Sequence, residues 1–400
     1  MATRPSKRPT VLIHCQYVYG IGHFVRTVEL ARGLSQYFSV YILNGGETIP
    51  SFELPPTIKI IQLPAIYKDE GMNSLKPVDP SISIEDCLSM RGVVIGQTLE
   101  KIKPDLLVTE HFPFGLLFEG EVIELIEKVK IKNPSAKIIS SVRDIIESGR
   151  GSKKDGHICD IIHSWYDLIL VHGDEHFAPL VTSFPVVSKL TVPIVHTGYI
   201  VRKMPTETAF SDLPIVLASV AGGRLGNELL DALVGSHLYT YQNRKHQLIL
   251  FSGAFQKDHD VLLSKISLLR EGCVKLLQFD SAAYKNYLIN ASLVISLGGY
   301  NSILESVSAK KPMLVYQRIF TANNEEQQLR INLFKKAGLL DVIYPQDLHA
   351  AQLTNLIVHK LANLEVPDFP LNLDGVQNAT KALISLFESH NMFSFANAIE

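Results

Sequence analysis

The stretch SLGGYNSILE, residues 296–305, joins a short apolar run to the start of a helical pattern. Gly298 and Gly299 let a ligand approach the backbone closely, because they carry no side chain. A helix that begins directly after them offers unpaired N–H groups and the positive end of its dipole to a phosphate. Glu305 lies one turn further on, where a carboxylate can accept hydrogen bonds from a ribose diol. The same residues also fit an ordinary strand–helix turn in which Glu305 only favours the helix N-terminus.

Short apolar runs alternate with amphipathic helical patterns on both sides of this stretch. The alternation predicts parallel sheets with crossover helices. We expect strands over residues 10–15, 40–43, 58–63, 105–109, 137–142, 168–172, 192–196, 215–220, 247–251, 274–278, 293–296 and 312–315. We expect helices over residues 24–36, 84–102, 118–129, 158–165, 227–241, 282–289, 302–309, 325–337, 348–364 and 375–389. The pattern predicts an α/β fold of two tandem doubly wound, Rossmann-like domains that face each other across a cleft.

Proline, threonine, glutamate and serine interrupt this rhythm at residues 201–214, as is typical of a linker. We therefore expect an N-terminal domain over residues 1–200 and a C-terminal domain over residues 215–372. A final helix and tail, residues 373–400, is free to pack back on the N-terminal domain. In doubly wound sheets ligands bind beyond the carboxyl ends of the strands, so site residues are expected in the loops that follow them.

Length and composition fit an ordinary soluble enzyme. A chain of 400 residues is longer than one core usually organises, and 46% hydrophobic with 20% charged residues is typical of globular proteins. The net charge of −2 argues against nucleic acid as a partner. No apolar run reaches the roughly 18 residues of a membrane span. No secretory signal opens the chain, and the four scattered cysteines predict reduced thiols of a cytoplasmic protein without a metal site.

Three blocks in the second half resemble the GT-B glycosyltransferases. Residues 296–305 resemble their donor-binding motif, a Gly-Gly-x-Asn-Ser/Thr-x-x-Glu run that holds a sugar nucleotide. Residues 324–330 (NEEQQLR) resemble the next block, in which an acidic or amide pair contacts the donor sugar, and residues 278–280 (QFD) stand where such enzymes hold the nucleobase. The resemblance implies a donor site made of Phe279, Gly298, Gly299, Asn301, Ser302, Glu305, Glu326 and Gln327.

Within that superfamily the chain is similar to the MurG-like enzymes, and particularly to a bacterial group described only as predicted glycosyltransferases. The similar features run along the whole chain: residues 20–23 with Arg26, residues 113–115 with Glu119, and residues 143–144, 171–174, 197–199 and 221–223. The resemblance implies a UDP-sugar donor. The first loop, residues 16–20 (QYVYG), lacks the small glycine-rich residues with which MurG receives its lipid acceptor, so the acceptor cannot be carried over.

The loop with Gly20 and Gly22 follows the first expected strand and ends at His23. In the resembling family a histidine in the matching loop serves as a general base for an acceptor hydroxyl. Imidazole suits this task because its pKa lies near neutrality. The resemblance implies inverting, metal-independent transfer, with backbone N–H groups and helix N-termini stabilising the leaving diphosphate. The open alternative is that His23 bonds a neighbouring carbonyl or only lines the acceptor pocket.

Further candidates stand at strand ends. Gly222 and Gly223 can cradle a diphosphate, with Arg224 neutralising its charge, although a tight turn explains them as well. Glu110 and Asp144 can orient His23 or bind acceptor hydroxyls, or else pair with local partners.

Other chemistries find less support. Val25 replaces the third glycine of a dinucleotide fingerprint, and no acid follows the second strand. No Gly-x-Ser-x-Gly nucleophile elbow is present. A group of strand-end polar residues lacks the tight spacing of metal ligands and predicts hydrogen-bonded structure instead: His163, His172, Asp174 and His176.

The sequence therefore predicts a glycosyltransferase that moves a sugar from a nucleotide donor, with a UDP-sugar expected, to a small-molecule, glycan or lipid-linked acceptor. The apolar run 112–118 suggests peripheral membrane contact, which a buried loop explains equally well. Two alternatives stay open. One is a sugar-nucleotide epimerase or hydrolase of the same fold, and the other is a nucleotide-sugar-binding protein without turnover.

Overall fold

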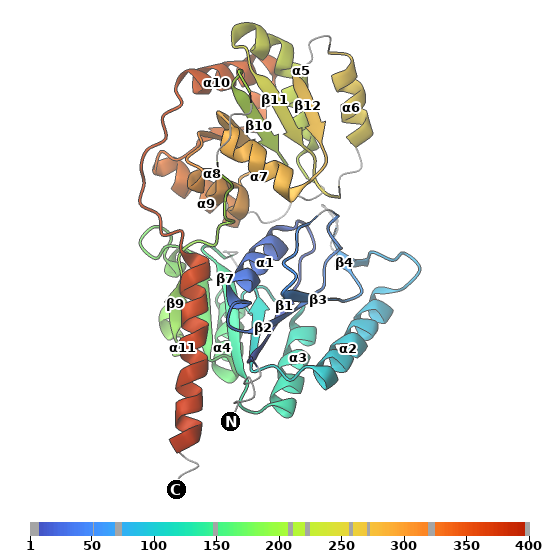
Figure 1. The fold of residues 1–400 in the computed structure, drawn as a ribbon, viewed down its shortest axis with the longest axis vertical. Helices are drawn as coiled ribbons and strands as arrows, with labels where there is room; N and C mark the ends of the chain where they lie inside the picture. Colours follow the sequence, from blue (N-terminus) through green and yellow to red (C-terminus); the bar gives the residue numbers. More distant parts are fainter. Residues whose placement is uncertain are drawn as a thin grey trace, which may run out of the picture.

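The computed structural model describes residues 8–50, 52–68, 74–146, 151–206, 211–220, 225–255, 259–269, 273–318 and 325–396, with side chains up to 389. The chain forms two α/β domains stacked along the long axis of the molecule (Figure 1). Each domain is built round one parallel sheet. The predicted α/β fold of two Rossmann-like domains is confirmed.

The N-terminal sheet has the strand order β3-β2-β1-β6-β7-β8-β9, and all its neighbours pair in parallel. Its strands are β1 (Thr10–Cys15), β2 (Ser39–Asn44), β3 (Ile58–Gln62), β6 (Leu106–Glu110), β7 (Lys137–Arg143), β8 (Leu168–His172) and β9 (Ile194–His196). The helices are α1 (Gly22–Leu34), α2 (Ile84–Lys101), α3 (Glu119–Lys132) and α4 (Ser152–Trp165), with two short 3₁₀ turns at Leu180–Thr182 and Val187–Lys189. Since the order reverses between β1 and β6, the ends of these two strands form the topological switch point at which such sheets bind ligands.

The C-terminal sheet repeats this plan with the order β12-β11-β10-β13-β14-β15, again all parallel. Its strands are β10 (Ile215–Ser219), β11 (Gln247–Phe251), β12 (Val274–Leu277), β13 (Leu293–Ser296), β14 (Met313–Tyr316) and β15 (Asp341–Ile343). The helices are α5 (Asn227–Asn243), α6 (His259–Ser267), α7 (Ser281–Asn290), α8 (Tyr300–Ser308), α9 (Glu325–Lys336) and α10 (Ala350–Ala362), with a 3₁₀ turn at Pro345–Leu348. The switch point lies between β10 and β13, so the stretch 296–305 is placed at it.

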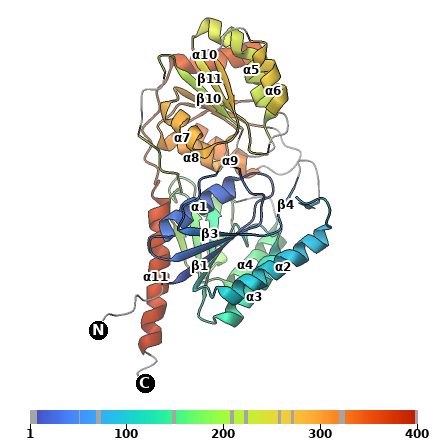
Figure 2. The same cartoon turned by 45° about the vertical axis from the view of Figure 1, so that its right-hand side comes forward.

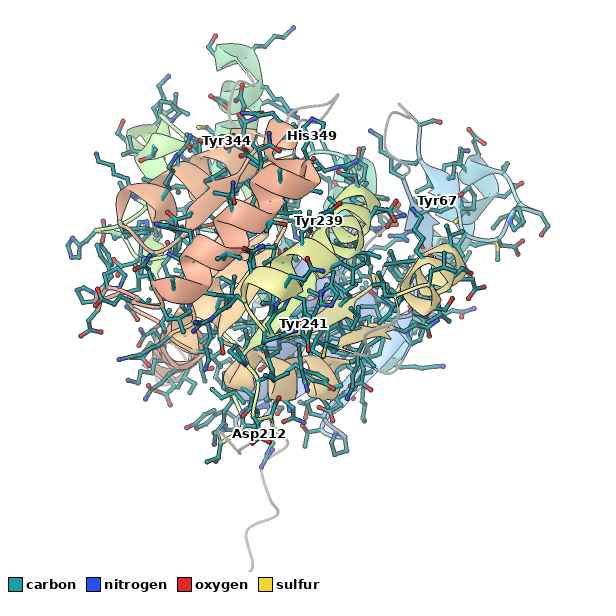
Figure 3. The ribbon with its side chains drawn as sticks, turned by 90° about the horizontal axis from the view of Figure 1, so that it is seen from above. Tyr67, Asp212, Tyr239, Tyr241, Tyr344 and His349 are labelled. Atoms are coloured by element: carbon teal, nitrogen blue, oxygen red, sulfur yellow. The ribbon has the colours of Figure 1, made fainter. Side chains whose placement is uncertain are left out.

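The outer face of the C-terminal domain is covered by α5 and α10, which lie side by side. Thr240 and Thr354 hydrogen bond across their contact at 3.0 Å. Figure 3 looks onto this face, where Tyr239 of α5 and His349, at the start of α10, are labelled. In Figure 1 this face lies at the end of the C-terminal domain that is turned away from the N-terminal domain, so it takes no part in the site described below.

The last helix, α11 (Gly375–Ala396), returns to the N-terminal domain and runs along its side (Figures 1 and 2). Gly33 of α1 permits the close approach, since a Cβ at that position would lie 2.4 Å from a methyl carbon of Val376. Leu383 is fully buried in the same apolar cluster as Leu34 of α1. The chain thus crosses between the domains twice, and the two crossings are joined where Tyr199 N–H donates to the Asn372 carbonyl at 2.7 Å.

The sequence missed three short features. One is helix α6, another is the edge strand β15, and the third is the two-residue hairpin of β4 (Ile66–Tyr67) and β5 (Lys76–Pro77). Their patterns are too short to show periodicity. Helix α4 begins at Ser152, whereas the sequence predicted a start at residue 158. The pattern missed its first turn because those residues are polar and mostly exposed.

We expect Leu383→Ala to lower the free energy of unfolding of the N-terminal domain by about 2–5 kcal/mol, because it removes a fully buried side chain between α11 and α1. Urea unfolding followed by tryptophan fluorescence measures this domain, since the only tryptophan, Trp165, packs on its core. The matched control is Ser385→Ala, at an exposed position of the same helix. Equal unfolding of the two variants would contradict the packing of α11 on this domain.

Candidate functional site

The two switch points face each other and are joined by direct contacts. Asn301, in the first turn of α8, donates its amide to the Gly22 carbonyl at 3.1 Å. Tyr300 is buried, donates its hydroxyl to the His172 carbonyl at 2.9 Å and accepts from the Ile200 N–H at 3.0 Å. The start of α8 is therefore held against the start of α1, and His23 lies beside this junction.

His23 is oriented from both sides of its ring. Its Nδ1 lies 3.0 Å from Oε1 of Glu110, and its Nε2 lies 3.1 Å from a guanidinium nitrogen of Arg143. A guanidinium can only donate, so Nε2 carries the lone pair and Nδ1–H donates to the carboxylate. Burial, followed by the positive charges of Arg143 and Arg26, holds the pKa of His23 well below 6.5. The lowered pKa keeps His23 neutral. Its side chain is 20% exposed, so a substrate can still reach it.

Glu110, at the end of β6, is the residue that fixes His23. Its carboxylate is buried and also accepts from Arg26 of α1 and, at 3.0 Å, from the Ser141 hydroxyl. Of the alternatives for Glu110, the hydrogen bond places it where it can orient His23. The next residue, His111, has a positive φ of 68° and its ring centre lies 5.3 Å from that of His23. Burial, together with His23 and Arg143, lowers the pKa of His111 to about 3, so it adds no charge here.

Glu326, in the first turn of α9, brings the C-terminal domain into the same cluster. Its Oε1 accepts from Arg143 and from Arg330, each at 2.8 Å. Burial raises the pKa of Glu326, but the two guanidinium groups outweigh it and hold the pKa at about 2. Glu326, which the resemblance assigns to the donor sugar, is thus ionised. Its carboxylate contacts Arg143, which in turn contacts His23.

Asp144 takes a different role from the one expected. It is fully buried and does not contact His23. Instead its carboxylate accepts from Arg330 of α9, at 2.7 Å from one terminal nitrogen and at 3.2 and 3.3 Å from Nε. It is an interdomain ion pair. The alternative that Asp144 serves structure is the one that the geometry favours.

The glycine pair stands as the motif predicts. Gly298 has a φ of +76°, and a Cβ there would meet Val315 and Ile331 at 2.6–3.0 Å, so only glycine fits. Gly299 is the residue before α8, and a Cβ there would make an ordinary contact with Oγ of Ser302 at 3.7 Å. Ser302 donates to the Gly299 carbonyl at 3.0 Å, and the Gln327 amide donates to the Leu297 carbonyl. These bonds set the shape of the loop and leave the first N–H groups of α8 available.

Glu305 is placed differently from the expectation of a ribose-binding carboxylate on the cleft surface. It is 2% exposed, and both its oxygens accept from Arg202, one of them at 2.6 Å. Arg202 also donates to the Ser281 hydroxyl at 2.7 Å. Arg202 lies in the crossing between the domains, so Glu305 fixes that crossing to the donor motif. A ribose can reach Glu305 only by sharing or displacing these bonds.

The remaining predicted residues are distributed as follows. Phe279 is half-buried and, like Phe52 and Phe255, packs on the apolar cluster of the N-terminal domain. Gly20 lies in the loop before α1, and Gly22 is the first residue of that helix; both are partly exposed. Gly222, Gly223 and Arg224 lie outside the described residues.

Several residues of this cluster were not singled out for a role by sequence reasoning: Arg26, His111, Arg143, Tyr300 and Arg330. The guanidinium carbons of Arg26 and Arg330 lie 5.1 and 5.6 Å from the centre of the Tyr300 ring. Tyr300 thus contributes cation–π contacts to both domains. The sequence offered one signal for this cluster, the placement of Arg143 at a strand end and of Arg26 and Arg330 on helices. Their partners lie in distant parts of the chain.

His172, one of the strand-end polar residues, and the apolar run 112–118 have structural roles in the N-terminal domain. His172 bonds the hydroxyls of Ser141 and Thr197, each at 2.9 Å. Within the described ranges no three or more His, Cys, Asp or Glu side chains are arranged to hold a metal. In the run 112–118, Phe112 and Phe114 are buried and Leu117 is 53% exposed. The helices of the described residues include none with the length and apolar character of a membrane span.

Comparison with known proteins identifies relatives of part of the chain. Residues 217–369 match the model of the glycosyltransferase family 28 C-terminal domain. Two relatives share the name UDP-N-acetylglucosamine–N-acetylmuramyl-(pentapeptide) pyrophosphoryl-undecaprenol N-acetylglucosamine transferase. The one from Geobacillus kaustophilus is 24% identical over 175 residues, which is 44% of this chain and 46% of the relative. The one from Clostridium botulinum is 26% identical over 144 residues, 36% and 38% of the two chains. The matched part thus spans less than half of either relative.

Solved structures show the same fold along the whole chain. MurG from Acinetobacter baumannii is 13% identical with a TM-score of 0.51, covering 95% of this chain and 99% of that chain. The calicheamicin glycosyltransferase CalG4 is 13% identical with a TM-score of 0.55, covering 94% and 95%. A Listeria monocytogenes protein provisionally named UDP-N-acetylglucosamine 2-epimerase is 12% identical with a TM-score of 0.56, covering 97% of both. The comparisons thus show similarity to glycosyltransferase family 28 over residues 217–369 and a fold shared with MurG and CalG4 along the whole chain.

We expect Asp144→Asn to lower the free energy of unfolding by about 3–5 kcal/mol, because among the described residues it leaves Glu326 as the only ionised partner of the buried Arg330. The matched control is Asp231→Asn, which breaks an ion pair with Lys265 in which both side chains are 49% exposed, and which should cost less than about 1 kcal/mol. Urea unfolding of both variants compares the two costs. A loss at Asp144 no larger than that at Asp231 would show that the interdomain pair adds nothing to stability.

Proposed function

We propose that this MurG-like glycosyltransferase transfers a sugar from a UDP-sugar to an acceptor hydroxyl, with His23 as the general base. The observation that carries the proposal is the geometry of His23. Its Nδ1 is fixed 3.0 Å from Glu110, its Nε2 lies 3.1 Å from Arg143, which also contacts the carboxylate of Glu326, and its side chain is 20% exposed. A neutral imidazole oriented by a carboxylate is the arrangement that general-base catalysis requires.

In the proposed reaction the acceptor oxygen forms a bond to the anomeric carbon while its proton passes to Nε2 of His23. The bond between the anomeric carbon and the leaving diphosphate oxygen breaks, and its electron pair leaves with the diphosphate. The imidazolium formed is stabilised by Glu110, which accepts from Nδ1–H throughout. Attack from the side opposite the leaving group inverts the anomeric configuration.

The donor is proposed to lie over Gly298 and Gly299, with its diphosphate at the N-terminus of α8. The backbone N–H groups there are oriented before the reaction begins, so they can stabilise the developing negative charge without a metal ion. Glu326 is proposed to accept from the donor sugar. UDP-N-acetylglucosamine is the first donor to test, because it stands in the names of both relatives.

The acceptor is proposed to be of the lipid-linked kind named for those relatives, with a soluble glycan as the other case to test. The loop after β1 differs from the glycine-rich loop of MurG, so the chemistry next to the attacking hydroxyl is proposed to differ as well. Vesicles that carry an undecaprenyl-linked acceptor, compared with soluble saccharides, distinguish the two classes.

A second candidate function is a sugar-nucleotide epimerase, because a structure so named shares the fold. A product assay separates the two functions. Transfer releases UDP in proportion to a new glycoside and only when acceptor is added, whereas an epimerase converts the sugar nucleotide without acceptor. Formation of an epimer by the isolated protein would refute transfer as the primary activity.

We expect His23→Ala to lower kcat by about 10²- to 10⁴-fold, since the proton acceptor is lost. The Kd of the donor, measured by calorimetry, should stay within about twofold, because His23 lies on the acceptor side. His359→Asn, at an exposed position of α10, serves as the control. Wild-type turnover in His23→Ala would show that another group accepts the proton.

The acid limb of the pH profile of kcat/KM should lie below pH 6.5. Burial and the charges of Arg143 and Arg26 lower the pKa of His23, so its neutral form persists as the pH falls from 8 to 6.5 and is lost only further down. Initial rates at subsaturating acceptor, from pH 8 to well below pH 6.5, measure the limb. A midpoint at or above pH 6.5 would show that His23 is not in the described environment during turnover.

A further inference from the structure

One guanidinium group occupies both halves of the candidate site. Arg143, at the end of β7, donates through one terminal nitrogen to Nε2 of His23 at 3.1 Å and through the other to Oε1 of Glu326 at 2.8 Å. Its side chain is 18% exposed, so it lines the cleft. Its Nε is buried and has no hydrogen-bond partner among the described residues. In this arrangement the lone pair that must take the acceptor proton is already used.

We propose that Arg143 is a positioning residue that couples the two substrates, by covering the base until a donor sugar binds at Glu326. The inference rests on the function proposed above and adds an order to it. A sugar hydroxyl that donates to Glu326 competes with Arg143 for the same carboxylate. When that bond weakens, the guanidinium is free to leave Nε2, and the acceptor hydroxyl can take its place. The donor therefore binds first.

The groups round His23 are consistent with such a movement. Arg26 of α1 is held by Glu110 and by the Tyr300 ring, and Arg330 of α9 is held by Asp144, so both are fixed. Among the described residues Arg143 has only Glu326 as an ion-pair partner, and this partner is shared with Arg330. His111 is neutral and has no charge to offer. Of the three arginines, Arg143 is thus the one whose departure leaves every remaining charge paired.

The free protein carries an unfavourable feature at the same residue. Nε of Arg143 is a strong donor, and leaving a buried donor without a partner is unfavourable. An arrangement in which Arg143 turns away from His23 gives this N–H a chance to bond, for example to an oxygen of a substrate. The described arrangement is therefore poised to change when ligands enter.

The test compares wild type with R143Q, R143K and a control, R32Q, in which an exposed arginine of α1 is changed. The first measurement needs no ligand. Proteins with ¹⁵N-labelled histidine are titrated by NMR, and His23 is assigned by its absence in the His23→Ala variant. Because Arg143 disfavours the protonated ring, His23 should titrate at a higher pH in R143Q than in wild type. R143K and R32Q should resemble wild type, since they keep the local charge.

The second measurement uses two probes, UDP and UDP-N-acetylglucosamine, and calorimetry. UDP does not reach Glu326, so its Kd should be equal in wild type and R143Q. UDP-N-acetylglucosamine should bind R143Q about two- to tenfold more tightly, because the bond from Arg143 to Glu326 no longer competes with the sugar. Hydrolysis of the donor by water, without acceptor, should rise in R143Q, and R143K should restore most of the wild-type behaviour.

Three results would overturn the inference. They are an unchanged His23 titration in R143Q, equal binding of the sugar nucleotide to wild type and R143Q, and a kcat loss of 100-fold or more without a change in titration. The last would make Arg143 a direct electrostatic catalyst. Failure of the proposed function looks different: neither probe would bind wild type, or His23→Ala would turn over normally, while the ligand-free titration still decides whether Arg143 covers His23.

Discussion

The buried ion pair of Asp144 with Arg330 joins the end of β7 to α9, and the other groups of the cleft are arranged round it. Three arginines and three carboxylates meet here: Arg26, Arg143 and Arg330 with Glu110, Asp144 and Glu326. Each buried ion costs several kcal/mol unless it is paired. The positive and negative charges balance only when all six groups are together. The cluster is therefore buried only while the two domains are in contact.

This balance determines the state of His23. A protonated imidazole would be a fourth cation among three carboxylates, in surroundings where an unpaired charge is expensive. The ring is therefore neutral in the free protein. During the proposed reaction the acceptor proton makes the His23 ring cationic just as the leaving diphosphate gains negative charge. The added positive charge is therefore balanced by the diphosphate. The charge count thus favours a base over a permanent cation at this position.

Sequence patterns predicted most of the fold, because strands buried on both faces are near-continuous apolar runs and the crossover helices are amphipathic. They also predicted that His23, Glu110, Gly298 and Glu326 lie at the carboxyl edges of the two sheets, since the strand ends of a parallel sheet share one edge. Partners could not be predicted in the same way. Asp144 and Arg330 are 186 residues apart, and nothing local in either segment specifies the other.

Glu305 shows the same limit in a motif. The Gly-Gly-x-Asn-Ser-x-x-Glu pattern placed it correctly on α8, but not its ion pair with Arg202, 103 residues away. A motif records residue type and spacing, whereas burial and pairing depend on how the interdomain crossing packs. Side-chain roles inferred from the motif are therefore most secure where the backbone itself acts, as at Gly298, and least secure for charged side chains.

Buried ion pairs seldom stabilise a protein more than well-packed apolar residues would, so stability alone does not explain six charges in one cleft. Exposure divides them by task. Asp144, Arg330, Arg26 and Glu110 are almost fully buried, and they hold the domains and the imidazole in place. Arg143 and Glu326 are the two that reach the cleft surface. A ligand can therefore rearrange these two while the buried pairs keep the domains in register, and this division lets one charged cluster serve both as a rigid joint and as a responsive site.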